Sequence, residues 1–397
     1  MTSRSATDLF SRVLLLVATT ALVGSCQTTA TSVKTISYVE KQVNCSALGA
    51  VGLRLPFPKA YWQLCWRNDA DSGLELTDVD YKPHSGSPLV PVLASARLAQ
   101  IDVPYDDGSQ DFSDLPGFGN ITAPLRPQDC TGRSRVVDPQ TGQALLCVQH
   151  EDPVIRKESY DYDFDTGNHL VVGACYNIFS IIPSRWYTYL PSWRLCDDGS
   201  VVGRLGAGGT LSPTARSAGN YGTVVGDGQA ATSHYHNVFW RLIFDLGGTD
   251  VLERSVVPLP GRRERTTTRT LAVETGRSAH AEIVWEAQSR SLRNAKGHLI
   301  GYDLQMHESP SYKSPSKRFT DFAIAATQFR ECERLASSNR RNSPGCGDSL
   351  DSFLDHEPLR RPVIWLQASI HHIPRDEDTP MMDEEWLDFA LHPRNVN

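Results

Sequence analysis

The chain has 397 residues and a formal net charge of −7 at pH 7, and it shows no internal repeat or long low-complexity linker. This acidic balance argues against a nucleic-acid partner, and a chain of this length can bury a large hydrophobic core. After the first two dozen residues, no stretch approaches the roughly 18 apolar residues that a membrane-spanning helix needs. We therefore expect the remaining chain to fold outside the bilayer, as one large domain.

The N-terminal segment has the pattern of an export signal. Arg4 and Arg12 precede the apolar run Val13–Val23, which is too short to span a bilayer. Small residues follow this run directly before Cys26, as at the processing site of bacterial lipoproteins. We expect residues 1–26 to be a lipoprotein-type signal peptide ending at a lipidated Cys26. The protein would then be anchored in the bacterial cell envelope, on its periplasmic or extracellular face. An ordinary signal peptide cut near the same place is the alternative.

Residues 27–54 begin with many Thr, Ser and Gln and predict a tether, with the folded domain at 55–397. In the domain, short runs of β-branched and aromatic residues recur between Gly, Asp and Pro turns. These predicted strands are Gly73–Tyr81, Leu98–Tyr105, His169–Ile182, Asn237–Leu246 and Arg361–Ile370. Helical periodicity is convincing only in Asp321–Leu335. The pattern favours an all-β fold, a large antiparallel β-sandwich with few short helices, over an α/β layout.

Nine cysteines are present, and setting Cys26 aside leaves an even number in a chain expected to be exported, which predicts disulfides. Eight cysteines allow 105 connectivities. The simplest pairs neighbours in sequence, Cys45 with Cys65, Cys130 with Cys147, Cys175 with Cys196 and Cys332 with Cys346. A zinc site is the competing interpretation, although no two cysteines have the C-x-x-C spacing that such sites favour.

Two histidines two residues apart indicate a possible metal site. His234 and His236 flank Tyr235, and strand alternation places both imidazoles on the same face. They could share one ion or simply lie in polar surroundings. The pair His371–His372, which follows a strand-like run, is the best source of a third ligand. Imidazole ligands suit Cu, Zn and Fe.

The residues around His372 are more specific. The segment His371–Pro380 reads H-H-I-P-R-D-E-D-T-P and resembles the T-H-[IV]-P-R-x-E-D-x-P segment of copper amine oxidases, the topaquinone-containing primary amine oxidases. The H-x-H pair followed five positions later by Arg241 is similar to the segment that carries the family's other two ligands. The resemblance implies that His234, His236 and His372 bind Cu(II), and that the sandwich is of this family's catalytic-domain type.

The resemblance also implies a tyrosine that becomes the quinone. The family's N-Y-[DE]-Y precedes a Trp and an Asp-Gly turn, and this chain has W-Y-T-Y at 186–189, followed by Trp193 and Asp198-Gly199. This spacing identifies Tyr187 as the topaquinone precursor. Trp186 stands where the family has Asn, and Thr188 stands where it has an acid. Without the resemblance, Tyr187 would be one more aromatic residue of a predicted strand.

A substrate base is suggested by a further match. The chain has V-P-Y ending at Tyr105 and then D-L-P-G-F-G from Asp114, which is similar to the family's V-P-Y and D-x-G-E-[YF]-G segments. By resemblance, Asp114 is the base and Tyr105 a hydrogen-bond partner of the quinone. Asp111 is a rival base. The same acids could instead belong to a solvated turn.

The resemblance extends from about residue 55 to the C-terminus. It implies a copper- and topaquinone-dependent enzyme that converts a primary amine and O2 to an aldehyde, ammonia and H2O2. A homodimer is also possible, as the family is typically dimeric. One alternative is an exported copper-binding protein of the same fold without cofactor formation or turnover. Another alternative is a lipid-anchored binding or structural sandwich in which the metal only links strands.

Overall fold

The computed structural model describes residues 45, 49–131, 134–159, 169–214, 219–226, 229–261, 263–278, 283–306, 312–339 and 346–396. The chain divides into two units, residues 1–37 and 38–397, and all of the description concerns the second. The predicted signal peptide, Cys26 and most of the predicted tether lie outside the described residues. Within those residues, no helix has the length and apolar character to cross a membrane.

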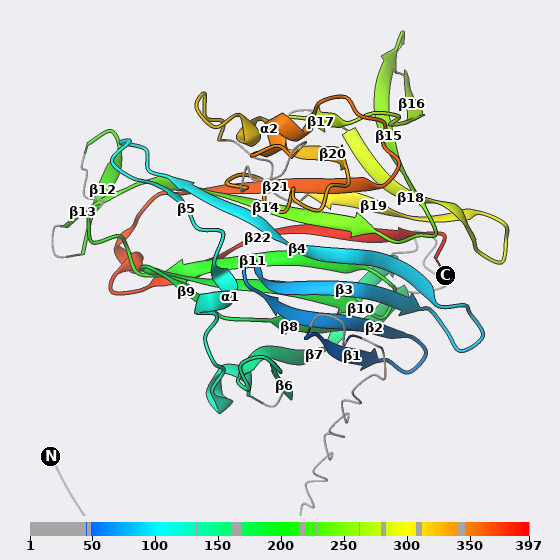
Figure 1. Cartoon of the computed structure of the whole chain (residues 1–397), viewed down its shortest axis with the longest axis horizontal. Helices are drawn as coiled ribbons and strands as arrows, with labels where there is room; N and C mark the ends of the chain where they lie inside the picture. Colours follow the sequence, from blue (N-terminus) through cyan, green and yellow to red (C-terminus); the bar gives the residue numbers. More distant parts are fainter. Residues whose placement is uncertain are drawn as a thin grey trace, which may run out of the picture. The chain divides into compact units, whose positions relative to one another are not determined.

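The first sheet contains nine strands among the described residues, and its neighbours pair antiparallel. In spatial order they are β1 (Val51–Pro56), β2 (Tyr61–Asp69), β3 (Gly73–Lys82), β4 (Val90–Pro104), β14 (His234–Phe244), β21 (Pro362–His372), β20 (Ile324–Gln328) and β17 (Thr275–Arg277), with β5 (Asp111–Ser113) paired to the end of β4. Figure 1 shows β14 and β21 side by side in the middle of this sheet.

The second sheet contains eleven strands among the described residues. In spatial order they are β16 (Arg263–Thr270), β15 (Thr249–Leu259), β18 (Ile283–Arg293), β19 (Leu299–Met306), β22 (Met382–Arg394), β11 (Val201–Gly209), β10 (Tyr187–Cys196), β8 (His169–Phe179), β7 (Ala144–Ser159) and β6 (Ser134–Val137), with β9 (Ile182–Ser184) paired to β10. A separate hairpin is formed by β12 (Gly222–Val225) and β13 (Gln229–Thr232).

Helices are few and short in the described ranges. They are α1 (Phe118–Ile121), α2 (Leu350–Phe353) and the 3-10 turns η2 (Pro127–Cys130), η3 (Arg318–Asp321) and η4 (Asp376–Asp378). The all-β prediction is confirmed. All five predicted strands overlap observed strands, but the predicted tether boundary at residue 54 falls inside β1.

The inner faces of the two sheets pack on each other. Trp240 on β14 lies with its ring 5.2 Å from that of Phe389 on β22, and the indole of Trp62 on β2 donates to the carbonyl of Cys196 on β10 at 2.8 Å. These large side chains are almost fully buried. Aromatic burial of this kind supplies much of the stabilisation of a sandwich, whose layers are about 10 Å apart.

The predicted helix at Asp321–Leu335 is wrong. The structure places β20 in this range, and Ala325 and Ala326 point into different hydrophobic clusters on opposite faces of its sheet. The indole of Trp365 on β21 also donates to the hydroxyl of Thr327 at 2.9 Å. A strand buried on both faces has apolar residues in succession, and periodicity alone does not separate it from a buried helix.

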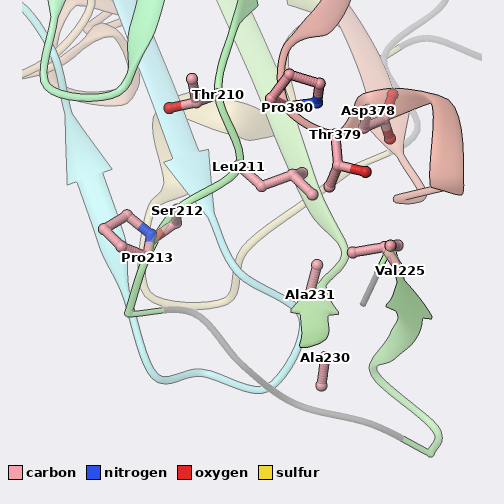
Figure 2. A pocket seen from close by; sticks show the side chains of 11 residues that line it. Thr210, Leu211, Ser212, Pro213, Val225, Ala230, Ala231, Asp378, Thr379 and Pro380 are labelled. Carbon is pink, nitrogen blue, oxygen red and sulfur yellow. The ribbon is translucent and has the colours of Figure 1, made fainter. Parts of the chain in front are cut away.

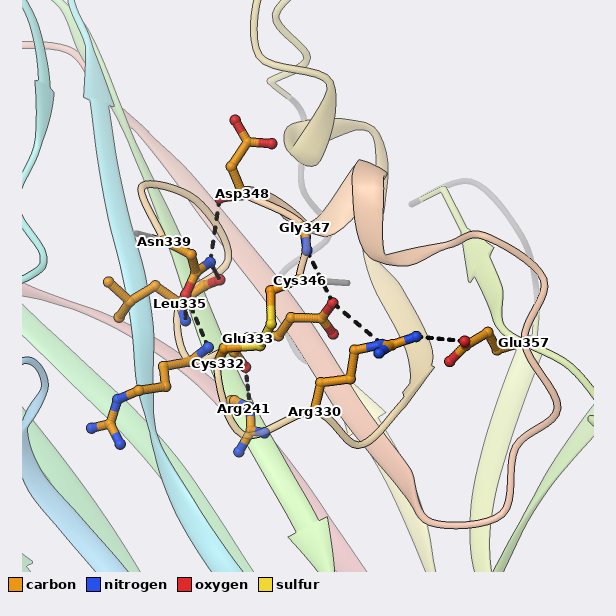
Figure 3. Close-up of a disulfide and its surroundings, with 11 residues drawn as sticks. Arg241, Arg330, Cys332, Glu333, Leu335, Asn339, Cys346, Gly347, Asp348 and Glu357 are labelled. Atoms are coloured by element: carbon orange, nitrogen blue, oxygen red, sulfur yellow. Dashed lines mark hydrogen bonds and ion pairs between the residues drawn. A yellow bond between two sulfur atoms is a disulfide. The ribbon is translucent and has the colours of Figure 1, made fainter. Parts of the chain in front are cut away.

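The remainder of that predicted helix is a turn closed by a disulfide, shown in Figure 3. The side-chain oxygen of Asn339 accepts the backbone N–H groups of Arg334 and Leu335 at 2.9 and 3.0 Å. The carbonyl of Glu333 accepts from the guanidinium of Arg241 at 3.0 Å. Side chains therefore form hydrogen bonds with backbone N–H and C=O groups that would pair with each other in a helix.

In the part of the chain that the structure describes, four disulfides join neighbours in sequence, as the simplest pairing predicts. They are Cys45 with Cys65, Cys130 with Cys147, Cys175 with Cys196 and Cys332 with Cys346. Each closes a short loop, and cross-links of this kind stabilise a fold mainly by restricting the unfolded chain.

Candidate active site

Three histidines meet between the two sheets because β14 and β21 are paired in register. His234 lies directly opposite His372 in the ladder, and His236 is two residues further along β14 on the same face. The ring of His234 is 5.1 Å from that of His236 and 5.0 Å from that of His372. All three side chains are buried. The structure therefore brings together the three histidines that the sequence indicated.

The neighbouring histidine, His371, points to the other face of β21. Its ring stacks on Tyr235 at 4.1 Å, and its Nε2 lies 2.8 Å from a carboxylate oxygen of Asp106. Strand alternation separates the two histidines of the pair, so only His372 faces the buried cluster.

The buried imidazoles have the properties of metal ligands. Burial, assisted by His372, lowers the pKa of His234 to about 3, and burial lowers the pKa of His236 well below its usual value. Both rings are therefore neutral at physiological pH and offer a lone pair. The Nδ1 atoms of His236 and His372 are buried without a hydrogen-bond partner among the described residues. A buried polar atom without a partner is costly, and a metal ion would satisfy it.

These residues fit a copper ion by their chemistry, since three neutral imidazoles suit Cu(II) and leave a coordination position for another ligand. Among the described residues, these three histidines do not form a group whose ligand atoms all lie within 4.8 Å, so their ring nitrogens must come closer together to share one ion. Nε2 of His234 lies 2.5 Å from the hydroxyl of Tyr187.

Asp378 forms a hydrogen bond with the ring of His372. Its carboxylate accepts from Nε2 of His372 at 3.1 Å and from the backbone N–H of Arg375 at 2.8 Å, and it is almost fully buried. A carboxylate on one ring nitrogen keeps the proton there and leaves the other nitrogen free for a metal. Sequence reasoning did not assign this role. The signal was present, because Asp378 lies inside the segment that resembles the third-ligand motif.

Tyr187 lies in contact with the histidine cluster. It begins β10, opposite Gly209 of β11, and its ring is 4.6 Å from that of His236. Gly209 has φ of +119°, and a Cβ there would lie 2.4 Å from the carbonyl oxygen of Trp186. Only glycine allows this approach, so Gly209 sets the position of Tyr187. Burial also raises the pKa of Tyr187 well above its usual value, which keeps the phenol protonated.

Tyr105 and Trp186 cover the other side of the cluster. Tyr105 stacks on His234 with ring centroids 4.5 Å apart, and the indole of Trp186 donates to the Tyr105 hydroxyl at 3.3 Å. Phe112 meets the Trp186 ring edge-on at 5.4 Å. Trp186, which stands where the resemblance led us to look for Asn, is therefore directed to Tyr105 and Phe112.

Asp114 faces Tyr187, whereas the rival Asp111 does not. Asp114 lines a small cavity together with Tyr187, and its carboxylate accepts from the hydroxyl of Tyr189 at 2.7 Å and from Arg185 at 2.6 Å. Burial raises its pKa, against the opposing effects of Tyr189 and Arg185. Asp111 forms an ion pair with Lys317 and is half exposed. Of the two predicted bases, Asp114 has the position and the environment for proton transfer.

Tyr187 separates two cavities of about 10 Å³ each. The cavity on one side contains Asp114, and the cavity on the other side is lined by His236, His372 and Asp378. Each has room for about one water molecule. Tyr187 thus has a carboxylate on one face and two of the three clustered imidazoles on the other.

A larger pocket of about 480 Å³ adjoins the small cavity beside His236 and His372 and is shown in Figure 2. Its walls come from the segment after β11, the β12–β13 hairpin and the turn around η4, and they are mostly small or apolar side chains. The lining residues are Thr210, Leu211, Ser212, Pro213, Val225, Gly226, Ala230, Ala231, Asp378, Thr379 and Pro380. Asp378 borders both this pocket and the small cavity beside His372.

A second cluster of possible ligands lies elsewhere, at Glu274, Asp355 and Glu357. The carboxylate of Glu274 accepts the backbone N–H groups of Gln328, Asp355 and Glu357 at 2.8 to 3.2 Å. Its oxygens therefore tie three chain segments together, which is a structural role.

The sandwich and the buried cluster define a β protein in which three histidines lie against a buried tyrosine. The family model for the enzyme domain of copper amine oxidase matches residues 60–396 of the chain. The chain belongs to this family, as the sequence motifs indicated.

Curated relatives are about a quarter identical to this chain over the aligned residues. A primary amine oxidase from Arthrobacter sp. (strain P1) is 24% identical over 350 residues, covering 76% of this chain and 53% of that protein. A histamine oxidase from Arthrobacter globiformis is 26% identical over 385 residues, covering 84% and 54%. The chain thus spans about half the length of the curated relatives it matches.

The fold also agrees with solved structures. The crystal structure of a copper-containing benzylamine oxidase from Hansenula polymorpha superposes with a TM-score of 0.71 at 18% identity, covering 86% of this chain and 60% of that one. An amine oxidase from Aspergillus nidulans gives a TM-score of 0.68 at 17% identity, covering 85% of this chain and 52% of that one.

Proposed function

We propose that the chain is a primary amine oxidase that uses Cu(II) and a topaquinone derived from Tyr187. The net reaction consumes one primary amine, one O2 and one water, and it yields an aldehyde, ammonia and H2O2. The observation that carries the proposal is the contact between the Tyr187 hydroxyl and Nε2 of His234 at 2.5 Å, within the three-histidine cluster. When bound, copper would supply O2 chemistry at this ring, and the quinone would supply a carbonyl for the amine.

The residues around Tyr187 would position and deprotonate the amine. Asp114 lies across the small cavity from Tyr187, where its carboxylate would accept the proton from the carbon next to nitrogen. Tyr189 donates to that carboxylate at 2.7 Å and fixes its orientation. Tyr105, stacked on His234, forms the wall of the same cavity and would bond the quinone oxygen.

The proposal is tested by loading the metal-free protein with Cu(II) in air, with Zn(II) as the control metal. We expect quinone absorption that reacts with phenylhydrazine, and H2O2 release on addition of primary amines. Tyr187→Phe should bind copper without developing colour. Bound copper without any quinone in the natural protein would contradict the proposal and would favour an exported copper-binding protein of the same fold.

We also propose that the chain is exported and anchored in a bacterial envelope by lipidated Cys26. The four described disulfides support an oxidising compartment. Cys26→Ser should move the protein from the membrane fraction to the soluble fraction of the envelope. An unchanged distribution would contradict the lipid anchor.

A homodimer is the assembly we propose. The hairpin of β15 and β16 projects from its sheet in Figure 1 and exposes Val256 and Leu259. Exposed apolar side chains on a projecting hairpin suit contact with a second chain. Light scattering of the purified protein should give the mass of two chains, and deletion of residues 256–266 should lower it to one.

A further inference from the structure

Arg185 lies at the solvent-facing edge of the small cavity between Asp114 and Tyr187. It follows β9 and precedes Trp186, with φ of 56°, a conformation uncommon for residues other than glycine. Its guanidinium donates to Asp114 at 2.6 Å, and its carbon lies 4.3 Å from the centre of the Phe112 ring. The turn, the ion pair and the aromatic ring together hold a permanent cation beside the proposed base.

Arg185 is also the movable wall of the cavity between Asp114 and Tyr187. The cavity measures about 10 Å³, so an amine larger than one water molecule enters only when a wall moves. Tyr105, Tyr187 and Asp114 are buried, whereas the side chain of Arg185 is 46% exposed. Of these four side chains, only the half-exposed Arg185 can turn outward into solvent without displacing buried neighbours, and we expect it to do so when the amine offers its guanidinium a partner in place of Asp114.

The charge of Arg185 affects which amines can approach. A primary amine is cationic at neutral pH, and it must reach a carboxylate that already has a cationic partner. Arg185 has five N–H donors in a fixed fork, and Asp114 is its only hydrogen-bond partner among the described residues. The remaining donors suit a planar carboxylate, which guanidinium groups bind with two parallel hydrogen bonds.

We propose that Arg185 is a specificity-determining residue that selects primary amines carrying a carboxylate at the end remote from the nitrogen. This inference rests on the proposed amine oxidase function. The substrate carboxylate replaces Asp114 as the partner of Arg185, and the guanidinium swings outward with it. Asp114 is then released to face the carbon next to the amine nitrogen. A diamine offers no such replacement, because its second cation competes with Arg185 for the same carboxylate.

The experiment compares γ-aminobutyrate, putrescine and butylamine, which share a four-carbon chain and differ in the remote group. Binding to the metal-free protein is measured by calorimetry, and kcat/KM for H2O2 release is measured on the copper-loaded protein. The natural protein should prefer γ-aminobutyrate over putrescine by about tenfold or more in both, since one charge-assisted hydrogen bond is sufficient for that factor. Arg185→Gln should reverse the order, and Arg185→Lys should fall between, because it keeps the charge and loses the fork.

Two results would overturn the inference. One is a natural protein that does not prefer γ-aminobutyrate in either measurement. The other is an Arg185→Gln variant in which affinity and kcat/KM change by the same factor for all three amines. Arg185 would then only restrict access to the cavity, without selecting among amines. The absence of quinone in the copper-loaded protein would instead count against the proposed function, while the order of binding to the metal-free protein still tests Arg185. Unfolding curves confirm that both variants are folded.

Discussion

Asp378 is expected to control copper affinity although it is not itself a ligand. Its buried carboxylate accepts from Nε2 of His372, which leaves Nδ1 of that ring as the buried nitrogen without a partner. In Asp378→Asn the side chain keeps its shape but loses its charge, and its amide can present a donor to Nε2. That donor would favour the tautomer with the proton on Nδ1, where the metal must bind.

The size of the effect follows from this contact. Removal of a residue that orients a metal-ligating histidine typically costs ten- to a hundredfold in metal affinity, or about 1.4 to about 2.7 kcal/mol. We expect a value near the middle of that range, because the backbone N–H of Arg375 still anchors residue 378 through a side-chain oxygen. Copper affinity is measured by competition with a chelator of known affinity, after unfolding curves have shown that the variant is folded.

Asp376→Asn is the matched control. Asp376 belongs to the same turn and is exposed, and its carboxylate accepts only the backbone N–H of Gly226 among the described residues, at 3.0 Å. This variant should bind copper as the natural protein does. Equal affinity in Asp378→Asn and the natural protein, or an equal loss in both variants, would refute the assignment of Nδ1 of His372 as a ligand atom.

Three further predictions concern catalysis and stability. Asp114→Asn should abolish H2O2 release while keeping the quinone colour, whereas Asp111→Asn should retain both; activity in the first variant would reject Asp114 as the base. Burial raises the pKa of Glu333 to about 7, so the folded state binds this proton more tightly and the free energy of unfolding falls, by about 2 kcal/mol, as pH rises from 4.5 to 7. Denaturant titrations should show that Glu333→Gln removes this slope, and an unchanged slope would contradict the pKa. Gly209→Ala should lose about 3 kcal/mol of stability, because its Cβ meets backbone, whereas Gly142→Ala, which has φ of +70° and open space, should lose about 1 kcal/mol in the same titrations.

Much of the site was predictable because its parts are local in sequence. Alternation along a strand places His234 and His236 on one face whatever the strand pairs with. The pairing of β14 with β21 is not visible in either segment alone, and the motif around His372 supplied that connection. The position of Tyr187 followed from its spacing to later residues, and the structure places it against His234.

The parts that sequence reasoning missed depend on contacts between distant residues. Arg185 meets Asp114 across 71 positions of sequence, and nothing in its own neighbourhood marks it as a partner of a base. The expected helix at Asp321–Leu335 failed for a related reason. Ala325 and Ala326 are both buried because a sheet and a second core lie on either side of β20, and tertiary packing of this kind overrides local periodicity.

The central claim is that the Tyr187 side chain is oxidised beside a copper ion held by His234, His236 and His372. Peptide mass spectrometry of protein loaded with Cu(II) in air tests it most directly, with Zn(II)-loaded protein as the reference. The account predicts that the peptide containing Tyr187 gains two oxygen atoms and loses two hydrogen atoms only with copper. An unmodified Tyr187 in protein that holds one copper per chain would contradict it.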